Sequence, residues 1–540
     1  MRFPASLRLR DTLFLFIVIA LFISLCWPFL QGMGVEVDGA LAATGIYLHS
    51  PALYSWHFGE YELPLMVLSY LGALEVWLCA PVFAVWGASL YTLRLPTLLL
   101  GVGTIVLFWL LLREISNRRA AWFGTLLLAT DTSFVMLTAI DFGPVCVQLF
   151  LKSAISLLFV RWYRSRRILP FIAAWFLLGV ALWAKALFIW IAGGMFLGIL
   201  VAAPRAVQAA FKPKLIAFAA LACGLGALPL ISYNIAFPLN TFRANAKIVP
   251  AAILEKVNVL NRTLDGTLLY GFFTSSEQSP HPGDLSKGFP HLVEQIVEIT
   301  QSPDSNWTVW AALAALCAVP FLWHTDARKP ALYAVVSFGS GWLAMASTAN
   351  AGGAAHHVIL LWPMPFLLIA VVASALTPRF SLPPKSQALV TAAVVSVAIV
   401  SVLVICHYLR DLVQNGPGIR WTNASEQLGT HLSKMKAKYI FIVDWGILES
   451  VDLLTEGKLP LLFGDEYVQP LDPIRLAALQ NLMAQPDTLF VTHPPELEQI
   501  PGRTQALETF ARKAGLQTEN LALIKDEYGR NIFQISRYHP

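Results

Sequence analysis

Charged residues are scarce in this chain. Asp, Glu, Lys and Arg make up 13% of its 540 residues, whereas 56% are hydrophobic and the mean hydropathy is +0.62. This composition lies outside the range of soluble globular proteins and excludes that class. The chain also lacks a basic patch interleaved with aromatic residues, so we expect no nucleic-acid partner. The composition predicts a polytopic membrane protein.

Paired cysteines are absent as well. The six cysteines all fall inside apolar runs, with neither a CxxC pair nor the spacing of metal ligands. This pattern argues against a disulfide framework and a zinc module, and the cysteines are interpreted as small core residues. No internal repeat of 20 to 50 residues is visible, which excludes solenoids and propellers.

Long apolar runs are abundant, and most are about long enough to cross a bilayer. We expect eleven transmembrane helices, near residues 12–30, 91–112, 120–138, 142–160, 169–184, 187–203, 215–235, 307–323, 331–347, 358–377 and 387–406. The first run follows a basic N-terminus like that of a signal peptide. It is too long for one and lacks a small-residue cleavage site, so we expect an uncleaved span. The run 64–87 is ambiguous because it carries Glu75 at its middle.

The basic residues decide the topology. If 64–87 lies along the membrane surface, the basic loops alternate along the chain, and the positive-inside rule makes all of them cytoplasmic. These loops contain Arg2, Arg8 and Arg10; Arg113, Arg118 and Arg119; Arg161, Arg164, Arg166 and Arg167; Arg205, Lys212 and Lys214; Arg328 and Lys329; and Arg379 and Lys385. If 64–87 spanned the membrane, REISNRR and RWYRSRR would both be translocated. We therefore predict a cytoplasmic N-terminus and one or two juxtamembrane helices in 64–87 on the outer face.

The outer face then carries the first loop 31–90, a large loop 236–306 and the chain after the last span. This tail changes composition abruptly and predicts a small soluble α/β domain, so the expected domains are 1–406 and 407–540. Within the tail, AKYIFIVDWGI and DTLFVTHPPE resemble strands, and PIRLAALQNLMAQ and ELEQIPGRTQALETFARKAG resemble amphipathic helices. LALIKDEYGRNIFQISRY predicts a hairpin that turns at residues 527–529.

Acidic residues near the outer ends of the spans are few, and ionisable groups at membrane depth usually pair or take part in function. Asp38, in GVEVDGA, and Asp141, in AIDFGPV, are the main candidates, although both could instead cap a helix. Asp131 lies nearer the middle of a span and is interpreted as the cap of a helix break. Glu62 and Glu75 add negative charge to the same outer face.

Basic candidates lie on this face too. Lys185, at an outer helix end, could extend to the membrane surface or hold a phosphate. His356 and His357, in GGAAHHVILLWPMPF, could be packed side chains or could contact a metal ion or a phosphate. The acids, the lysine and the histidine pair thus share one membrane face, beneath a large loop and a soluble domain.

These motifs occur in a familiar order. An Asp in the first outer loop is followed by the aromatic-rich YSWHFGEYELPLMVLSYLGALEVW, then LLATDTSFVMLTAIDFGPV, then GVALWAKALFIWIAGG. Over roughly residues 10–205 the chain resembles the GT-C fold glycosyltransferases of the bacterial protein mannosyltransferase and aminoarabinose transferase type, which are glycosyltransferase family 39 and its relatives. GGAAHHVILLWPMPF extends the resemblance to the later helices.

The resemblance implies a GT-C membrane domain in a bacterial inner membrane. It would move a sugar from a polyprenyl-phosphate donor to a protein, lipid or glycan acceptor on the periplasmic face. Asp38 would be the base of an inverting transfer, and Asp141 would lie opposite it. The leaving phosphate needs positive charge. The candidate partners of the phosphate are Lys185, Arg243, Arg262, His356, His357 and a divalent metal ion.

The sequence departs from the family patterns at two places, which are the residue after Asp38 and the region where relatives bind the lipid phosphate. Asp38 is followed by Gly39 where the mannosyltransferases commonly have Asp-Glu. Glu62-Leu63-Pro64 stands in a region where the aminoarabinose transferases have Lys-Pro-Pro, so Glu62 is a candidate substrate-binding residue and the phosphate needs another cation. Two other classes stay open: a transporter or lipid flippase, and a GT-C ligase or polymerase of lipid-linked glycans.

Overall fold

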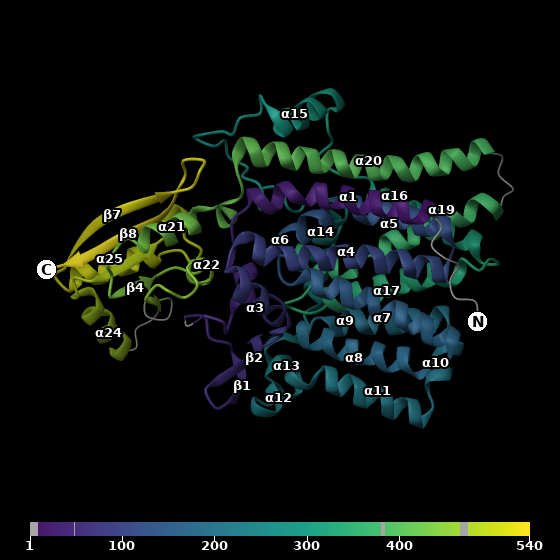
Figure 1. The fold of residues 1–540 in the computed structure, drawn as a ribbon, viewed down its shortest axis with the longest axis horizontal. Coiled ribbons are helices and arrows are strands. Elements are labelled where there is room, and N and C mark those ends of the chain that lie inside the picture. Colours follow the sequence, from purple (N-terminus) through teal and green to yellow (C-terminus); the bar gives the residue numbers. More distant parts are fainter. Residues whose placement is uncertain (1–8, 48, 380–383, 465–472) are drawn as a thin grey trace.

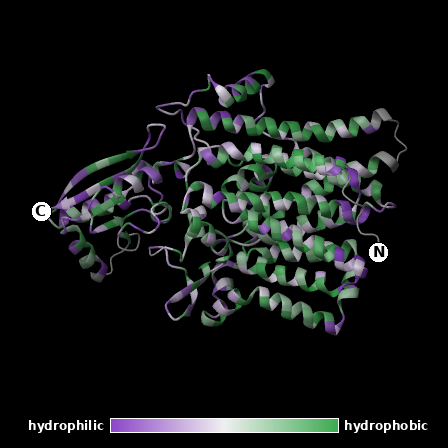
Figure 2. Cartoon of the chain, in the orientation of Figure 1, coloured by the Kyte–Doolittle hydropathy of each residue, from purple (hydrophilic) through white to green (hydrophobic). Residues whose placement is uncertain are grey.

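The computed structural model describes residues 9–47, 49–379, 384–464 and 473–540. It consists of a bundle of long helices and a C-terminal α/β domain, which packs against one end of the bundle (Figure 1). Helix α1 (Leu9–Gly32) begins at the opposite end. Hydrophobic residues cover the helices along their length, whereas the α/β domain is more mixed (Figure 2). The predicted class, a polytopic helical membrane protein with a small C-terminal α/β domain, is confirmed.

Each of the eleven predicted spans coincides with a helix or with a bent group of helices. Besides α1, the bundle contains α4 (Leu90–Ile115), α5 (Arg118–Thr130), α6 (Thr132–Ile140), α7 (Val145–Ser165), α8 (Ile168–Ala184), α9 (Phe188–Ala202), α11 (Pro213–Gly226), α12 (Leu228–Ala236), α16 (Thr308–Ala318), α17 (Arg328–Ala346), α19 (Met364–Arg379) and α20 (Pro384–Asn415). By length and composition, five helical segments among the described residues could cross a membrane, or up to eight if each bent pair forms one span. The count of eleven stays a prediction, because α8 and α16 are shorter apolar helices and α17 is not among the segments apolar enough to cross.

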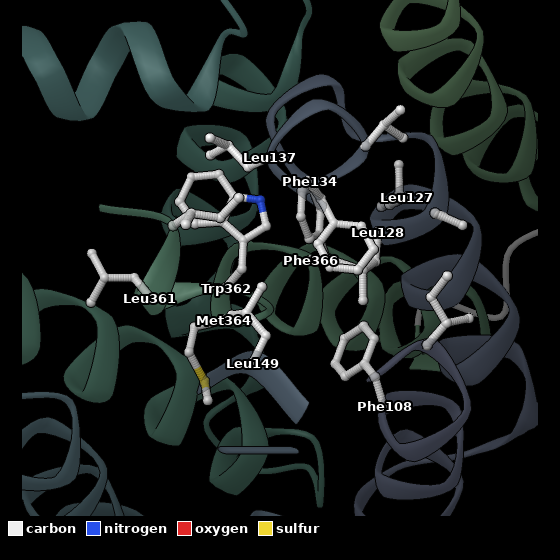
Figure 3. Close-up of a cluster of buried hydrophobic side chains, with 14 of the residues drawn as sticks. Phe108, Leu127, Leu128, Phe134, Leu137, Leu149, Leu361, Trp362, Met364 and Phe366 are labelled. Carbon is white, nitrogen blue, oxygen red and sulfur yellow. The ribbon is translucent and has the colours of Figure 1, made fainter. Parts of the chain in front are cut away.

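Helices α5 and α6 form a broken span with a bend of 58°. Asp131 lies at the break and caps α6: its Oδ1 accepts hydrogen bonds from the Phe134 backbone N–H and from the Trp362 indole N–H, both at 2.8 Å. Figure 3 shows the Trp362 ring near Phe134 and Leu137, inside a buried hydrophobic cluster. The prediction that Asp131 caps a helix break is confirmed, and the buried carboxylate is hydrogen-bonded, as expected at this depth.

The first outer loop forms a small sheet that the sequence did not predict. Strand β2 (Tyr61–Leu68) pairs in antiparallel fashion with β1 (Tyr54–Phe58) and with β3 (Leu71–Gly72). Within 64–87 only α3 (Leu74–Trp86) is helical, so the prediction of helices across 64–87 is correct for its second half and wrong for its first. Four consecutive residues, 64–67, are buried in β2, and such a short apolar run cannot be assigned to strand or helix from its periodicity.

The large loop 236–306 contains three helices, α13 (Asn240–Asn245), α14 (Ile253–Leu264) and α15 (Gly288–Thr300). Helix α15 packs along the outer part of α20 (Figure 1). The remaining short helices outside the α/β domain are α2 (Val37–Ala40), η1 (Leu41–Ala43), α10 (Pro204–Ala210), η2 (Pro250–Ala252), η3 (Val319–Leu322), α18 (Ala355–Val358) and η4 (Ile359–Leu361).

The α/β domain is built on a five-stranded sheet in the order β5-β4-β6-β8-β7. Strand β4 is parallel to β5 and β6, whereas β8 is antiparallel to β6 and β7. Its elements are η5 (Ile419–Trp421), α21 (Ala424–Leu432), β4 (Tyr439–Ile442), α22 (Leu448–Leu454), β5 (Leu461–Phe463), α24 (Pro473–Met483), β6 (Thr488–Thr492), η6 (Pro495–Leu497), α25 (Arg503–Lys513), β7 (Gln517–Lys525) and β8 (Asn531–His539). The predicted strands, helices and hairpin are present, although the helix predicted over 496–515 begins only at Arg503. Strand β5 was missed because three residues give no periodic signal.

The α/β domain is held directly against the first outer loop. The backbone N–H of Gly34 donates to the carbonyl of Trp421 at 2.6 Å. A Cβ atom at Gly34 would lie 1.9 Å from the carbonyl oxygen of Thr422, so only glycine allows this approach. Further hydrogen bonds join the domain to the end of α20 and the chain after it, from the Tyr528 hydroxyl to the carbonyl of Leu412 and from the Arg530 guanidinium to the carbonyl of Pro417.

Candidate active site

Ionisable side chains gather at the end of the bundle that faces the α/β domain. The residues are Asp38 in α2, Glu75 in the first turn of α3, Asp141 after α6, Lys185 after α8, His356 and His357 in α18, and Arg420 in η5. Their charges act on one another: Lys185 and Arg420 influence the pKa of Asp38, while Asp38, Asp141 and Glu75 influence that of Lys185. The fold therefore brings six elements to one centre.

Arg94 fixes the start of the first loop. This buried side chain of α4 donates hydrogen bonds to the carbonyls of Leu30 at 2.7 Å, Met33 at 2.6 Å and Gly34 at 2.5 Å. The carbonyls at the end of a helix have no partner within the helix, and a cation there also complements the helix dipole. Arg94 therefore ties the end of α1 to α4. It also fixes the position of the chain that leads to Asp38.

Arg94→Met should destabilise the protein strongly. The substitution leaves the carbonyls of Leu30, Met33 and Gly34 without their donor, at about 1–3 kcal/mol for each buried unsatisfied group. Thermal unfolding in detergent should show a clearly lower midpoint than the wild type. Arg205→Met, at an exposed arginine of α10, is the matched control and should leave the midpoint unchanged. An Arg94→Met protein as stable as this control would contradict the anchoring role.

Two neighbouring acids of the first loop have different environments. Glu36 caps α2, since its Oε2 accepts from the backbone N–H of Asp38 at 2.8 Å, and it forms an ion pair with Arg420. The carboxylate of Asp38 has no hydrogen-bond partner among the described residues. Burial raises the pKa of Asp38, and the charges of Lys185 and Arg420 partly offset that rise. Asp38 is thus available for chemistry, whereas Glu36 is engaged in structure.

Asp141 caps a helix and also pairs with another acid. It adopts a left-handed backbone with φ of 47°, and its Oδ1 accepts from the backbone N–H of Cys146 at 2.9 Å. Its Oδ2 atom is buried and has no hydrogen-bond donor among the described residues. A protonated Glu75 could supply that donor. Burial, and then the charge and hydrogen bond of Asp141, raise the pKa of Glu75 well above its usual value. Two buried carboxyl groups this close disfavour both being charged at once.

Lys185 points into the site instead of extending to the membrane surface. Its side chain is buried, and its Nζ donates to the carbonyl of Gly143 at 2.8 Å. Burial lowers the pKa of Lys185 to about 8, although Asp38, Asp141 and Glu75 all favour the charged form. A buried cation with one carbonyl partner can offer its remaining protons to an anion.

The histidine pair packs against the same centre. The rings of His356 and His357 lie 4.2 Å apart between centroids, and the ring of Phe142 lies 4.4 Å from that of His356. The Nδ1 atom of each histidine is buried without a hydrogen-bond partner among the described residues. Across the described ranges, no group of three or more His, Cys, Asp or Glu side chains is placed to hold a metal ion.

Arg420 is the residue that the sequence analysis missed. Besides the ion pair with Glu36, its guanidinium lies 4.8 Å from the ring centroid of Trp445 and 5.9 Å from that of Phe272. It follows α20 closely, in a segment that the sequence predicts to lie on the outer face, where the positive-inside rule disfavours arginine. An arginine at a position where the rule disfavours one was the signal in the sequence that could have identified Arg420.

Two predicted substrate-binding residues lie outside the cluster. Glu62 is exposed on β2, opposite His57 in the hairpin, and Arg243 is exposed on α13. Helix α13 does border the site, because Thr241 donates to the carbonyl of Ser69 in the turn between β2 and β3. The described contacts bring Asp38, Asp141, Lys185, His356 and His357 together, but not Glu62 or Arg243.

Comparisons with known proteins agree with this architecture. The family model of dolichyl-phosphate-mannose-protein mannosyltransferases matches residues 73–233, which include Glu75, Asp141 and Lys185. A comparison with curated protein sequences finds no match.

Among solved structures, ArnT from Cupriavidus metallidurans in the apo state matches with a TM-score of 0.59 and 14% identity, over 97% of this chain and 98% of that chain. ArnT bound to undecaprenyl phosphate matches with a TM-score of 0.56 and 14% identity, over 97% of each chain. The oligosaccharyltransferase AglB from Archaeoglobus fulgidus, in complex with an inhibitory peptide and a dolichol-phosphate, matches with a TM-score of 0.51 and 10% identity, over 96% of this chain and 70% of that chain.

Proposed function

We propose that this chain, which has the fold of the GT-C glycosyltransferases, is a membrane enzyme that transfers a sugar from a polyprenyl-phosphate donor to a hydroxyl group. The transfer takes place on the face that carries the α/β domain. One observation carries the proposal: Asp38, a carboxylate without a hydrogen-bond partner among the described residues, lies in the same charged cluster as the buried cation Lys185. The undecaprenyl phosphate bound to ArnT supports the same class of donor.

Asp38 is the proposed base of a single displacement. As the acceptor oxygen bonds to the anomeric carbon, the bond from that carbon to the phosphate oxygen breaks, and the acceptor proton passes to Asp38. Attack opposite the leaving group inverts the anomeric centre, and no covalent sugar intermediate is needed. The reaction requires a base and a cation at opposite sides of the sugar, and the cluster contains both.

Lys185 is the proposed partner of the leaving phosphate, with Arg420 as a second cation in the same field. Positive charge held in place before the reaction stabilises the negative charge that develops on the phosphate. Burial raises the pKa of both Asp141 and Glu75, which favours less negative charge near that phosphate. His356 and His357 are further candidates to contact the phosphate or to bind a divalent metal ion.

We also propose the location and orientation. The protein resides in a bacterial inner membrane, with its N-terminus in the cytoplasm and the α/β domain in the periplasm. This orientation follows from the basic loops and places the proposed site on the periplasmic side.

The direct test is sugar transfer by the purified protein in lipid nanodiscs. A panel of radiolabelled polyprenyl-phosphate sugars serves as donors, with total membrane lipid, periplasmic protein and cell-wall glycan as acceptors, each with Mn²⁺ or with EDTA. We expect label in one acceptor fraction and release of polyprenyl phosphate. Movement of an unmodified lipid across the bilayer without sugar transfer would support a flippase instead.

The rate of transfer should show a bell-shaped dependence on pH. The base must be ionised, so the rate rises with pH through the pKa of Asp38, which burial places above the usual range for aspartate. The phosphate partner must be protonated, so the rate falls as pH rises through the pKa of Lys185, about 8. In Lys185→Arg the upper limb should move out of the measured range, because arginine stays charged. A wild-type rate that does not fall as pH rises through about 8 would contradict the assignment of Lys185, and one that does not fall at acid pH would contradict that of Asp38.

A further inference from the structure

The chain segment that carries His356 and His357 is held in place by residues from outside it. This histidine segment, residues 346–362, runs from the end of α17 through α18 and η4 to the residues before α19. Its first part, 347–354 with the sequence STANAGGA, forms no helix and has mostly small side chains. The position of the histidines is therefore decided by the hydrogen bonds that other elements make to the backbone of the segment.

The large loop holds the start of the histidine segment. The buried ammonium of Lys256, in α14, donates hydrogen bonds to the carbonyl of Ala346, at 3.2 Å, and to that of Thr348. Beside it, the backbone at 247–249 pairs with that at 347–349 through two hydrogen bonds of 2.7 and 2.8 Å. Carbonyls at the end of a helix have no partner within the helix, and a cation there also complements the helix dipole. Lys256 therefore fixes the chain where it leaves α17.

Lys152 holds the other end of the histidine segment from inside the bundle. Its side chain, in α7, is almost fully buried, and its Nζ donates to the carbonyl of Leu360 at 2.9 Å. Leu361 and Trp362, which follow, lie in the buried cluster of Figure 3, where the Trp362 indole also donates to Asp131. Among the described residues no carboxylate pairs with Lys152. An ionisable side chain inside a membrane bundle is costly and usually pairs or takes part in function.

The histidine rings lie between these two anchors and beside the proposed phosphate cation. A Cβ atom at Gly143 would lie 3.0 Å from Cδ2 of His356 and 3.4 Å from Nζ of Lys185, so the imidazole and the ammonium flank the same residue. Both histidines are half-buried, and no hydrogen bond among the described residues involves either ring. Unsatisfied polar groups inside a protein call for an explanation, and a ligand that hydrogen-bonds to the imidazoles would supply one.

We propose that Lys152 and Lys256 are positioning residues, which hold the histidine segment so that His356 and His357 contact the phosphate of the lipid-linked donor. Each lysine acts through the backbone carbonyls that it bonds, on either side of the histidines, and not through the ligand itself. The inference rests on the proposed function, because it gives the histidine pair a fixed place beside Lys185. A site that is fixed before the ligand binds loses less affinity to ordering.

Protection of the histidines from chemical modification tests this role without any sugar transfer. The full chain in nanodiscs is treated with diethyl pyrocarbonate, which modifies accessible imidazoles. Mass spectrometry then measures the modification of each histidine as undecaprenyl phosphate is added. We expect the lipid to protect His356 and His357 and to leave His431, an exposed histidine of α21, unprotected. Polyprenol without a phosphate is the parallel probe, and it should protect much less at the same concentration.

Variants of the two lysines measure the positioning. Lys152→Met and Lys256→Met should each need about ten times more undecaprenyl phosphate for half-protection, the value of one lost hydrogen bond. Lys256→Arg keeps donors for the carbonyls at the end of α17 and should retain most of the affinity. Lys436→Met, at an exposed lysine of the α/β domain, is the matched control. Tyr528→Phe loses a hydrogen bond to Leu412, outside the segment, and should lower stability without changing protection.

The outcomes separate the positioning role from the proposed function. Protection that depends on the lysines supports the role even if no sugar is ever transferred. In a working transfer assay, both methionine variants should raise the KM for the donor and leave kcat nearly unchanged, because the contact exists before and during the reaction. The inference is overturned, with the proposed function left standing, if transfer occurs but the lipid does not protect His356 and His357. It is also overturned if polyprenol protects them equally well, or if both lysine variants behave like Lys436→Met.

Discussion

Asp38→Asn should lower the rate of sugar transfer by about 10²- to 10⁴-fold, the usual contribution of a general base. The amide has nearly the same shape as the carboxylate but cannot take up the proton of the acceptor hydroxyl. Because the Asp38 side chain has no hydrogen-bond partner among the described residues, the substitution should leave the fold intact. The loss should therefore appear in kcat with little change in the KM for the donor. The measurement is initial transfer rate in nanodiscs, with thermal unfolding as the test of folding.

Two acids of the same loop serve as comparisons for Asp38. Glu60→Gln changes an exposed acid in the turn between β1 and β2 and should keep the wild-type rate. Glu36→Gln should lower stability, because it weakens the ion pair with Arg420 and the cap of α2. If Asp38→Asn transfers sugar as fast as Glu60→Gln does, Asp38 is not the base.

Lys185→Met should lower transfer by about 10²- to 10³-fold, as expected when one group that stabilises developing charge is removed. Methionine fills a similar volume but leaves the phosphate with the more distant field of Arg420. The defect should also weaken inhibition by free polyprenyl phosphate, since the ammonium would contact the phosphate in the product as well. Rates and inhibition constants are measured near pH 7, where the wild-type lysine is mostly charged.

The control for Lys185 is a lysine in the large loop 236–306. Lys247, in the large loop, is exposed, and Lys247→Met should leave both the rate and the inhibition unchanged. Lys185→Arg keeps the charge and should restore part of the rate. If Lys185→Met loses rate but binds polyprenyl phosphate as tightly as the wild type does, the lysine does not contact the phosphate, and the loss comes from its hydrogen bond to Gly143.

The helices were the most predictable part of this fold. Long apolar runs and the alternation of basic loops identified each helical segment of the bundle, because crossing a bilayer imposes both signals strongly. The sheet of the first loop was not predictable, since the buried residues of β2 form a continuous apolar run without alternation. The structure of β2 is decided by its pairing with β1 and β3. Such pairing depends on neighbouring strands and not on the local sequence of β2.

The candidate site was predictable in part. Asp38, Asp141 and Lys185 could be found because charge is rare near the outer ends of spans, and the structure places them in one cluster. The roles of Glu75 and Arg420 required the fold: one is paired with Asp141 across the chain, and the other comes from a segment assigned to a separate domain. Glu62 and Arg243 have the right residue types, but exposed positions leave them outside the cluster.

The close contact at Gly34 limits how this protein can be divided or recombined. Since the backbone of the first loop touches Thr422 with no room for a side chain, the surface of the α/β domain is shaped to this particular loop. An α/β domain exchanged with that of a relative should function only if the first loop is exchanged with it. The unit that must be exchanged together is therefore neither the bundle nor the domain alone, but the domain with the loop that carries Asp38.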